Sequence, residues 1–128
     1  WSRTRESAIL SGICLARCKF MNGGKIAWSI IRASDFRKIR GRDEDVDAVA
    51  DEMRSIKEVE IAVLFREKGA GALRVSLRSK NKINIASVAE RYNGGGHYDV
   101  AGCTIPNNKR SMREVLDLAA KLLGITRP

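Results

Sequence analysis

Hydrophobic residues recur at two spacings along this chain, and the two spacings alternate. A spacing of three to four residues predicts amphipathic helices over residues 4–20, 34–39, 43–56, 84–92 and 111–123. A strict alternation of apolar and polar residues predicts strands over residues 25–32, 59–67, 72–79 and 103–105. This interleaving predicts a single α/β domain over residues 1–128, with a four- or five-stranded mixed sheet and helices packed on it. The pattern does not specify the order of the strands.

Short polar and glycine-rich segments mark where the predicted elements begin and end. The turn Gly69–Gly71 joins two alternating runs, which is typical of a β-hairpin. Asn84 is expected to cap the fourth helix. Ser111 and Glu114 are expected to form a capping box at the start of the last helix, and Gly124 is expected to end it.

The length and composition are those of one globular domain. Hydrophobic residues make up 44% and charged residues 30% of the 128 residues, which argues against a disordered chain. No apolar run approaches the roughly 18 residues of a membrane-spanning helix. The first residues lead into no hydrophobic signal segment, so a cytoplasmic location is expected.

The chain is strongly basic. Its 24 lysines and arginines against 15 acidic residues give a formal net charge of +9. A surplus of this size favours a polyanionic partner, such as nucleic acid or a nucleotide. A basic surface that only serves solubility is the alternative.

The three cysteines are not expected to form disulfides, because their number is odd and no secretory signal precedes them. Cys14 and Cys18 are four residues apart on one helix face, and Cys103 lies in a predicted strand. With one histidine in the chain and no Cys-x-x-Cys pair, a zinc site is not expected. We predict small, buried thiols at these positions.

The segment Asn93–Gly102 contains four glycines and the only histidine of the protein. Consecutive glycines can adopt positive φ angles and let another molecule approach closely. Their backbone N–H groups can form a concave, anion-binding nest, and we expect Gly95 to sit at positive φ within it. His97 follows directly and is suited to contact a phosphate or a base. The alternative is a flexible surface loop.

This segment resembles a family signature. Gly94-Gly95-Gly96-His97, followed after two residues by Val100-Ala101-Gly102, is similar to the Gly-Gly-Gly-His-x-x-Ala-Ala-Gly signature of the DHH phosphoesterase family. That signature belongs to the family's C-terminal, DHH-associated domain. The strand ending in Ser76-Leu77-Arg78-Ser79 resembles the family's Ser-x-Arg-Ser motif. The resemblance extends from about Ser7 to Leu123. Val100 stands where the family has alanine, and both residues are small and apolar.

The resemblance implies that the chain is a substrate-binding domain. Full-length members carry an N-terminal domain whose Asp-His-His motif and further aspartates hold two metal ions, usually manganese, which activate water for displacement at phosphorus. This chain has one histidine and no Asp-His-His, so we expect no catalytic residue, cofactor or metal ligand in it. The acids of residues 43–47 are expected to complement a helix dipole instead.

The resemblance also implies which residues bind phosphate. Gly94, Gly95, Gly96 and His97 would hold one phosphate, and Arg78, with Ser79 beside it, would hold another. Arg78 points away from the apolar face of its strand, and we predict that its guanidinium faces solvent and grips phosphate in a bidentate way.

Other basic and aromatic residues are assigned lesser roles. Arg66 and Arg74 are expected to contribute a general positive field from neighbouring strands. Tyr98 is the aromatic residue nearest to the glycines, whereas Tyr92 and Trp28 follow the apolar spacing and are predicted to pack in the core.

The parent enzyme implied by the resemblance hydrolyses phosphoester bonds in short RNA oligomers or small nucleotides, such as adenosine bisphosphate or a cyclic dinucleotide. Its partner domain would be the N-terminal Asp-His-His domain of the same chain, and the present chain alone is expected to be inactive. The alternative is a stand-alone RNA-binding module, similar to the related domain at the C-terminal end of alanyl-tRNA synthetase. The sequence does not specify the substrate, the metal or the oligomeric state.

Overall fold

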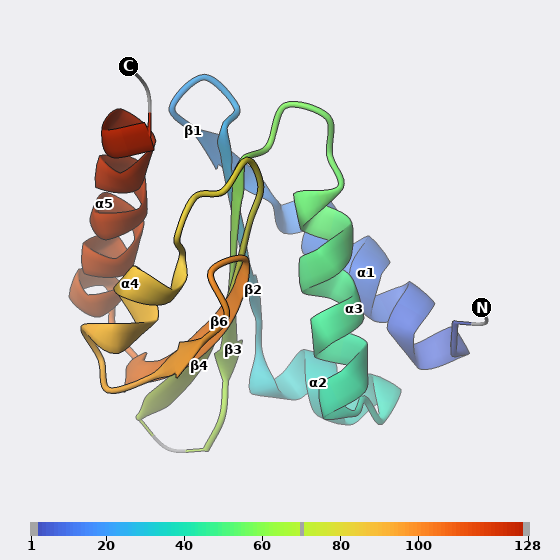
Figure 1. The fold of residues 1–128 in the computed structure, drawn as a ribbon. Coiled ribbons are helices and arrows are strands. Elements are labelled where there is room, and N and C mark those ends of the chain that lie inside the picture. The colour runs from blue at the N-terminus through green and yellow to red at the C-terminus, as the bar shows by residue number, and fades with distance from the viewer. Residues whose placement is uncertain (1–2, 70, 127–128) are drawn as a thin grey trace.

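Helices lie on both faces of a central sheet in the computed structural model, which describes residues 3–69 and 71–126 (Figure 1). Helices α4 and α5 cover one face, and α1, α2 and α3 cover the other. The helices are α1 (Arg5–Arg17), α2 (Ala33–Ile39), α3 (Asp43–Arg54), α4 (Ala86–Glu90) and α5 (Lys109–Thr126). Trp1 and Ala70, the middle residue of the predicted glycine turn, lie outside the described residues.

The described residues form one mixed sheet of six strands in the order β1-β2-β3-β4-β6-β5. Strands β2 and β3 are parallel, and every other neighbouring pair is antiparallel. The strands are β1 (Lys19–Met21), β2 (Ile26–Ile31), β3 (Ile61–Glu67), β4 (Ala72–Ser79), β5 (Gly95–Gly96) and β6 (Val100–Pro106). The predicted α/β domain with a mixed sheet is confirmed. The predicted strand number is too low because β1 and β5 are too short to show an alternating pattern.

Several predicted helix ends are wrong, each for a local reason. The first helix ends at Arg17, because Cys18 is extended and the chain enters β1. Helix α4 begins at Ala86 without a side-chain cap, so Asn84 does not cap it. The remaining errors concern α5. Its first turn is capped by Asn108, whose Oδ1 accepts the Ser111 N–H over 2.7 Å, and the helix continues past Gly124.

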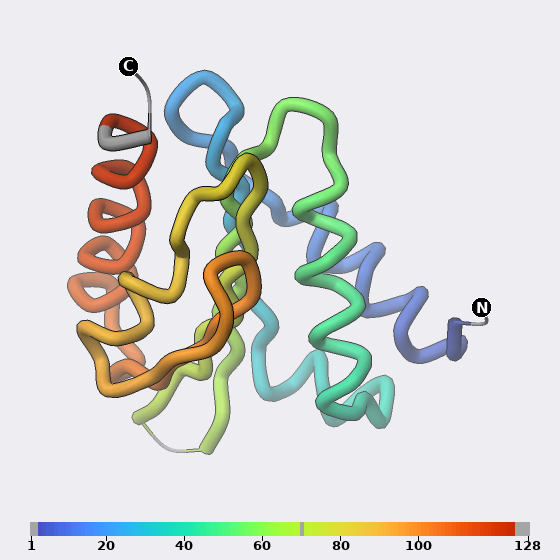
Figure 2. The backbone as a smooth tube through the Cα atoms, viewed as in Figure 1, coloured from blue at the N-terminus to red at the C-terminus, as the bar shows by residue number. Residues whose placement is uncertain are grey.

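Alternate residues of the central strands divide the interior into two cores. On β4, Leu73, Val75 and Leu77 belong to the core beneath α4 and α5. Successive side chains of a strand point to opposite faces, so Arg74, Ser76 and Arg78 point toward the α3 side. After α4 the chain forms β5, which pairs with β6, and β6 pairs with β4, as the backbone trace shows (Figure 2). The fold therefore brings the two sequence motifs to neighbouring strands.

The residues assigned to the core are largely found there. Cys14 and Cys103 are buried, and burial raises the pKa of their thiols to about 12 and about 11. Cys18 is only partly buried. The Trp28 ring meets Phe65 edge-on at 6.0 Å between centroids, within the core beneath α5. Tyr92 is partly buried, and its hydroxyl donates to Glu114 over 2.7 Å.

None of the described helices is long and apolar enough to cross a membrane.

Candidate anion-binding site

A pocket of about 460 Å³ opens beside α3, over strands β4, β6 and β5. Helix α3 contacts β2, β3 and β4, and the sheet continues beyond it as β6 and β5. The floor consists of small residues, because Ser76 lies opposite Gly102 and Gly102 lies opposite Gly95 in the strand register. Four basic side chains reach this pocket, from Arg66, Lys68, Arg74 and Arg78.

Four of the six predicted binding residues line this pocket and two do not. Arg78, Gly95, Gly96 and His97 are lining residues, although they come from two separate sequence motifs. Ser79 is 3% exposed, and its hydroxyl donates to the carbonyl of Ile83 over 2.6 Å, with the carbonyl of Tyr98 at 3.1 Å. Ser79 therefore holds neighbouring backbone. Gly94 also lies outside the pocket lining and packs against β6.

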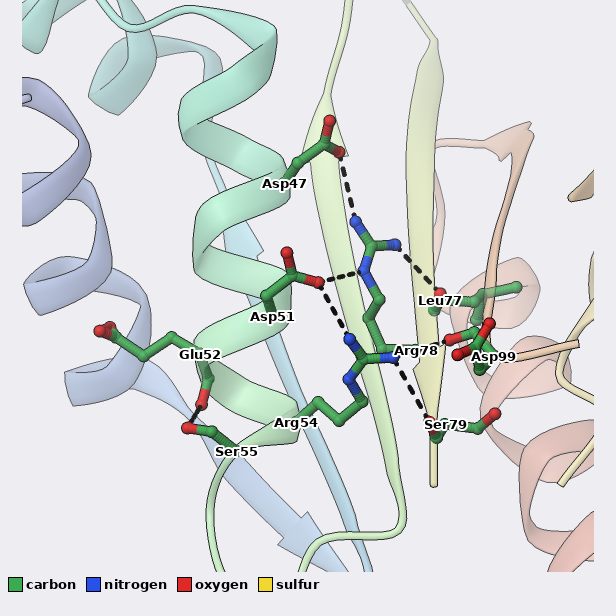
Figure 3. A network of polar contacts seen from close by, with 9 residues as sticks. All are labelled: Asp47, Asp51, Glu52, Arg54, Ser55, Leu77, Arg78, Ser79 and Asp99. Carbon is green, nitrogen blue, oxygen red and sulfur yellow. Dashed lines mark hydrogen bonds and ion pairs between the residues drawn. The ribbon is translucent and has the colours of Figure 1, made fainter. Parts of the chain in front are cut away.

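Arg78 does not face solvent as predicted but is only 4% exposed. Its Nε donates to Oδ1 of Asp51 over 2.8 Å, and Nη1 donates to the carbonyl of Leu77 over 3.1 Å (Figure 3). Nη2 makes a longer, 3.4 Å contact with Oδ1 of Asp47. The prediction failed because the polar face of β4 packs against α3. The guanidinium nevertheless reaches the pocket wall.

The three consecutive glycines are glycines for different reasons. A Cβ at Gly94 would lie 2.2 Å from the carbonyl oxygen of Gly102, so Gly94 packs tightly against β6. Gly96 has a φ of +144°, and a Cβ there would lie 2.4 Å from the carbonyl oxygen of Val100. Gly95 lacks a positive φ, contrary to expectation, and a Cβ there would meet no atom within 4 Å. No steric contact within the described residues therefore requires a glycine at position 95.

The predicted nest of successive N–H groups is not formed. The Gly94 N–H donates to the carbonyl of Ala89 over 2.9 Å, and the His97 N–H donates to the carbonyl of Val100 over 2.7 Å. Gly95 and Gly96 form β5, which pairs with β6. The glycines thus provide a flat, uncovered surface and a turn that presents His97.

The turn that carries His97 is held by Ser79, which was predicted to bind phosphate, and by Arg54, which the sequence did not suggest. The carbonyl of Asp99 accepts from the Ser79 N–H over 3.0 Å and from Arg54 Nη1 over 3.1 Å. Arg54 also pairs with Asp51, the carboxylate that holds Arg78 (Figure 3). Asp51 and Arg54 are three residues apart and therefore lie on one face of α3. This spacing could have indicated from the sequence that the two side chains pair.

The acidic residues of the pocket are engaged with arginines. Asp43 pairs with Arg66, and this hydrogen bond holds the pKa of the Asp43 carboxyl below its usual range. Asp47 contacts Arg78 as described above. Among residues 3–69 and 71–126, no group of three histidine, cysteine or acidic side chains is arranged to hold a metal ion. The pocket therefore does not fit the two-metal centre that the resemblance assigns to the parent enzyme.

A second pocket, of about 780 Å³, lies between the end of α1, strand β2 and the start of α5. Its lining includes Trp28, Met112 and Leu116, together with several basic residues. None of the predicted binding residues lies in it. The smaller pocket is therefore the candidate site, because it unites both motifs.

Together, the fold and the site define an α/β domain with a basic, glycine-lined pocket at one side of its sheet. The sequence profile of the DHHA1 domain matches residues 23–124, and the chain belongs to this family. The pattern-based resemblance to the DHH phosphoesterases, in their C-terminal associated domain, is thereby confirmed.

Comparison with known proteins supports the same assignment. The chain is 29% identical over 104 residues to the bifunctional oligoribonuclease and PAP phosphatase NrnA of Mycoplasma genitalium, an alignment that covers 81% of this chain and 32% of that protein. The chain thus spans about a third of the length of this relative. An exopolyphosphatase-related protein from Bacteroides fragilis has the same fold, with a TM-score of 0.80 at 22% identity, over 98% of this chain and 36% of that one.

A third comparison leads to a protein of another class. The C-Ala domain of Aquifex aeolicus alanyl-tRNA synthetase superposes with a TM-score of 0.60 at 18% identity, over 82% of this chain and 97% of that domain. At this identity, the similarity establishes a shared fold.

Proposed function

We propose that this chain binds phosphate groups of small nucleotides or short RNA oligomers, as the substrate-binding domain of a DHH-type phosphoesterase. The observation that carries the proposal is the meeting of Arg78, Gly95 and His97 in one pocket. The open space over Gly95 supports a ligand at that position, because no internal contact requires a glycine there. A side chain at Gly95 would occupy the space that ligand atoms need.

Arg78 and His97 share one phosphate in this proposal. Arg78 lies opposite Val100 in the register of β4 and β6, and His97 is hydrogen-bonded to the same residue. The sequence suggested two separate phosphates for these groups, whereas their common neighbour favours one. Nη2 of Arg78 can exchange its 3.4 Å contact with the exposed Asp47 for a phosphate oxygen. The bond from Nε to Asp51 would keep the guanidinium oriented during that exchange.

The remainder of the parent protein would supply the chemistry. Two divalent metals, manganese by the family resemblance, would be held by the Asp-His-His domain and would activate the water. The present chain would bind the substrate and fix the scissile bond relative to that centre, which is a positioning effect. We expect the purified chain alone to leave a dinucleotide intact with manganese added.

A stand-alone RNA-binding module is the second candidate, and the C-Ala fold similarity supports it. The two candidates differ in the ligand that they require. A phosphoesterase domain binds a mononucleotide or a di- or trinucleotide through the pocket. An RNA-binding module prefers a folded RNA and makes contacts over a wider basic surface.

Calorimetric titration with adenosine 3′,5′-bisphosphate tests the proposal. We expect His97→Ala and Arg78→Lys each to weaken binding by about tenfold or more, because each removes a directed hydrogen bond to a charged group. Arg110→Ala is the matched control, since Arg110 is an exposed residue of α5 outside the pocket. Unchanged affinity of both variants would contradict the proposal. Binding of a folded RNA but not of the nucleotide would favour the second candidate.

A further inference from the structure

The second pocket lies at the other edge of the sheet from the candidate site. Strand β1 pairs only with Ile26–Trp28 of β2, so among the described residues no strand continues this edge beside Ser29–Ile31. The carbonyl of Ile30 accepts from Arg17 Nη1 over 3.1 Å, so the Ile30 carbonyl faces the open edge. The N–H and C=O of one strand residue point to the same side, so the Ile30 N–H faces this edge too. An open edge of this kind can pair with a further strand.

Apolar side chains line the second pocket on the α5 side of this edge. Trp28 and Ile30 of β2 and Met112 of α5 are only partly buried, and all three pack against the core beneath α4 and α5. Leu116, four residues after Met112 on the same helix, completes the apolar lining. Methionine is flexible and adapts to apolar groups of different shapes. The pocket can therefore accept a bulky apolar side chain.

The charged residues that line the second pocket are all basic. They are exposed and come from the end of α1, from β1, from the residue after β2 and from the start of α5: Arg17, Lys19, Arg32, Lys109 and Arg113. The three arginines have acidic partners outside the lining. The side chains of Lys19 and Lys109 form no ion pair or hydrogen bond within residues 3–69 and 71–126. The charge of the pocket is therefore complementary to an acidic ligand.

We propose that the second pocket binds an extended, acidic segment of a partner protein, which adds a strand to the open edge of β2. An apolar side chain of the segment contacts Trp28 and Met112, and its carboxylates meet Lys19 and Lys109. Pairing with a sheet edge provides affinity through main-chain hydrogen bonds, and a pocket for alternate side chains provides specificity. Arg17 covers the Ile30 carbonyl in the free chain and exchanges it for a carboxylate of the segment. This inference is independent of the function proposed for the candidate site.

The lining favours a peptide over a nucleic acid or a second copy of this chain. Single-stranded nucleic acids stack their bases on accessible aromatic rings. Trp28 is the one aromatic residue among the described lining residues, and its ring is partly buried and meets Phe65 edge-on. An open strand edge instead matches the hydrogen-bonding groups of another polypeptide. A second copy, with a net charge of +9, would bring charge of the same sign to the basic lining.

Peptides with alternating residues test the proposal, because an added strand directs successive side chains to opposite faces. The probe is a fluorescein-labelled mixture of peptides about seven residues long, in which leucine or phenylalanine alternates with glutamate. A mixture with lysine in place of glutamate is its control. Fluorescence anisotropy should show that the acidic mixture binds to the unaltered chain and that the lysine mixture does not.

Two double variants of equal net charge separate the pocket from the general charge of the chain. Lys19→Glu with Lys109→Glu reverses both unpaired charges of the pocket, and we expect it to weaken peptide binding by about tenfold. Lys57→Glu with Lys121→Glu is the matched control, since both lysines are exposed and lie outside the pocket. The control should bind the peptides at least severalfold tighter than the pocket variant. Both variants should bind adenosine 3′,5′-bisphosphate with equal affinity, because that ligand belongs to the candidate site.

Backbone amide shifts locate the bound peptide, and we expect the largest changes at Ile30 and Met112, with none at His97. The proposal is overturned if the acidic mixture does not bind, if the lysine mixture binds equally well, or if both double variants keep the same affinity for the peptides. Displacement of the peptide by hexaadenylate would show a nucleic-acid surface instead. Shifts of the same amides with protein concentration, in the absence of peptide, would show that a second copy of the chain occupies the pocket.

Discussion

Arg78 of β4 donates its Nε to Asp51 of α3 over 2.8 Å, and this bond joins the sheet to the helix at the wall of the pocket. Asp51 is shared with Arg54, whose guanidinium also holds the carbonyl of Asp99. The turn that carries His97 is thus connected to Arg78 through α3 (Figure 3). The two motifs are fixed relative to each other before any ligand binds, which lowers the entropic cost of binding.

Arg78 is therefore a structural residue as well as a candidate ligand. Replacing it by alanine removes bonds to Asp51 and to the carbonyl of Leu77. We expect Arg78→Ala to lower the free energy of unfolding by about 1.5–3 kcal/mol, the usual range for a hydrogen bond to a charged group. Urea denaturation measures this loss, with Arg110→Ala as the exposed control. A variant as stable as the unaltered chain would show that the buried arrangement is wrong.

The neighbouring glycines Gly95 and Gly96 should respond differently to the same substitution. Gly96→Ala forces a Cβ against Val100 at a φ of +144°, and we expect a loss of about 1–3 kcal/mol. Gly95→Ala places its Cβ in open space, so stability should change by less than about 0.5 kcal/mol. The same change should weaken nucleotide binding. Thermal unfolding and ligand titration of both variants check this pair, and equal stability losses would contradict the described backbone.

Much of the fold followed from the sequence, because its longer elements have clear periods. The strand Ala72–Ser79 was predicted with its observed bounds, and the α3 helix was predicted from the apolar spacing that begins at Val46. Strands β1 and β5 were missed because three and two residues cannot display a period. Asn108 was missed as a helix cap because Ser111 and Glu114 formed a more familiar pattern.

The site was predicted less completely than the fold. The sequence named Arg78 and His97 as candidates, but it did not reveal that Arg78 is buried, since burial depends on which helix covers the face of a strand. Because α3 lies over β4, the expected surface charge of Arg78 is a buried guanidinium that pairs with the exposed Asp51. The alternation of apolar and polar residues likewise did not predict the register of β3 and β4, which places Arg66 opposite Arg74.

An ion pair outside the candidate site, between Arg17 and Asp35, makes stability depend on pH. Arg17 Nη2 donates to Asp35 over 3.0 Å, and this bond, aided by the Arg32 N–H, holds the pKa of the Asp35 carboxyl below its usual range. A lowered folded-state pKa stabilises the protein above the ordinary value of about 3.9, and the stabilisation is lost as the pH falls through the lowered pKa. Acid unfolding should therefore be steeper for the unaltered chain than for Asp35→Asn.

The control for that comparison is Asp117→Asn, which removes an exposed carboxylate of α5. We expect its stability to follow pH in parallel with the unaltered chain. If the stability of Asp35→Asn also follows pH in parallel with that of the unaltered chain between about pH 2 and 5, the ion pair with Arg17 does not contribute to the pH dependence.

Nucleotide binding should weaken as salt concentration rises. Contacts with two to three phosphates of a short single strand predict a slope of about −1.4 to −2.1 in a plot of log affinity against log salt. Arg74→Ala should make the slope shallower, because it removes a positive charge from the pocket lining. Affinity that is independent of salt would indicate that the ligand is bound through its base or sugar.

The most direct test of the central claim is to locate a bound nucleotide by nuclear magnetic resonance. The isotope-labelled chain is titrated with adenosine 3′,5′-bisphosphate, and backbone amide shifts are followed at each residue. We predict that the largest changes occur at Gly95, Gly96 and His97, with smaller changes at Arg78. Changes concentrated around Trp28 and Met112, in the second pocket, or no changes at saturating nucleotide, would contradict the assignment of the site.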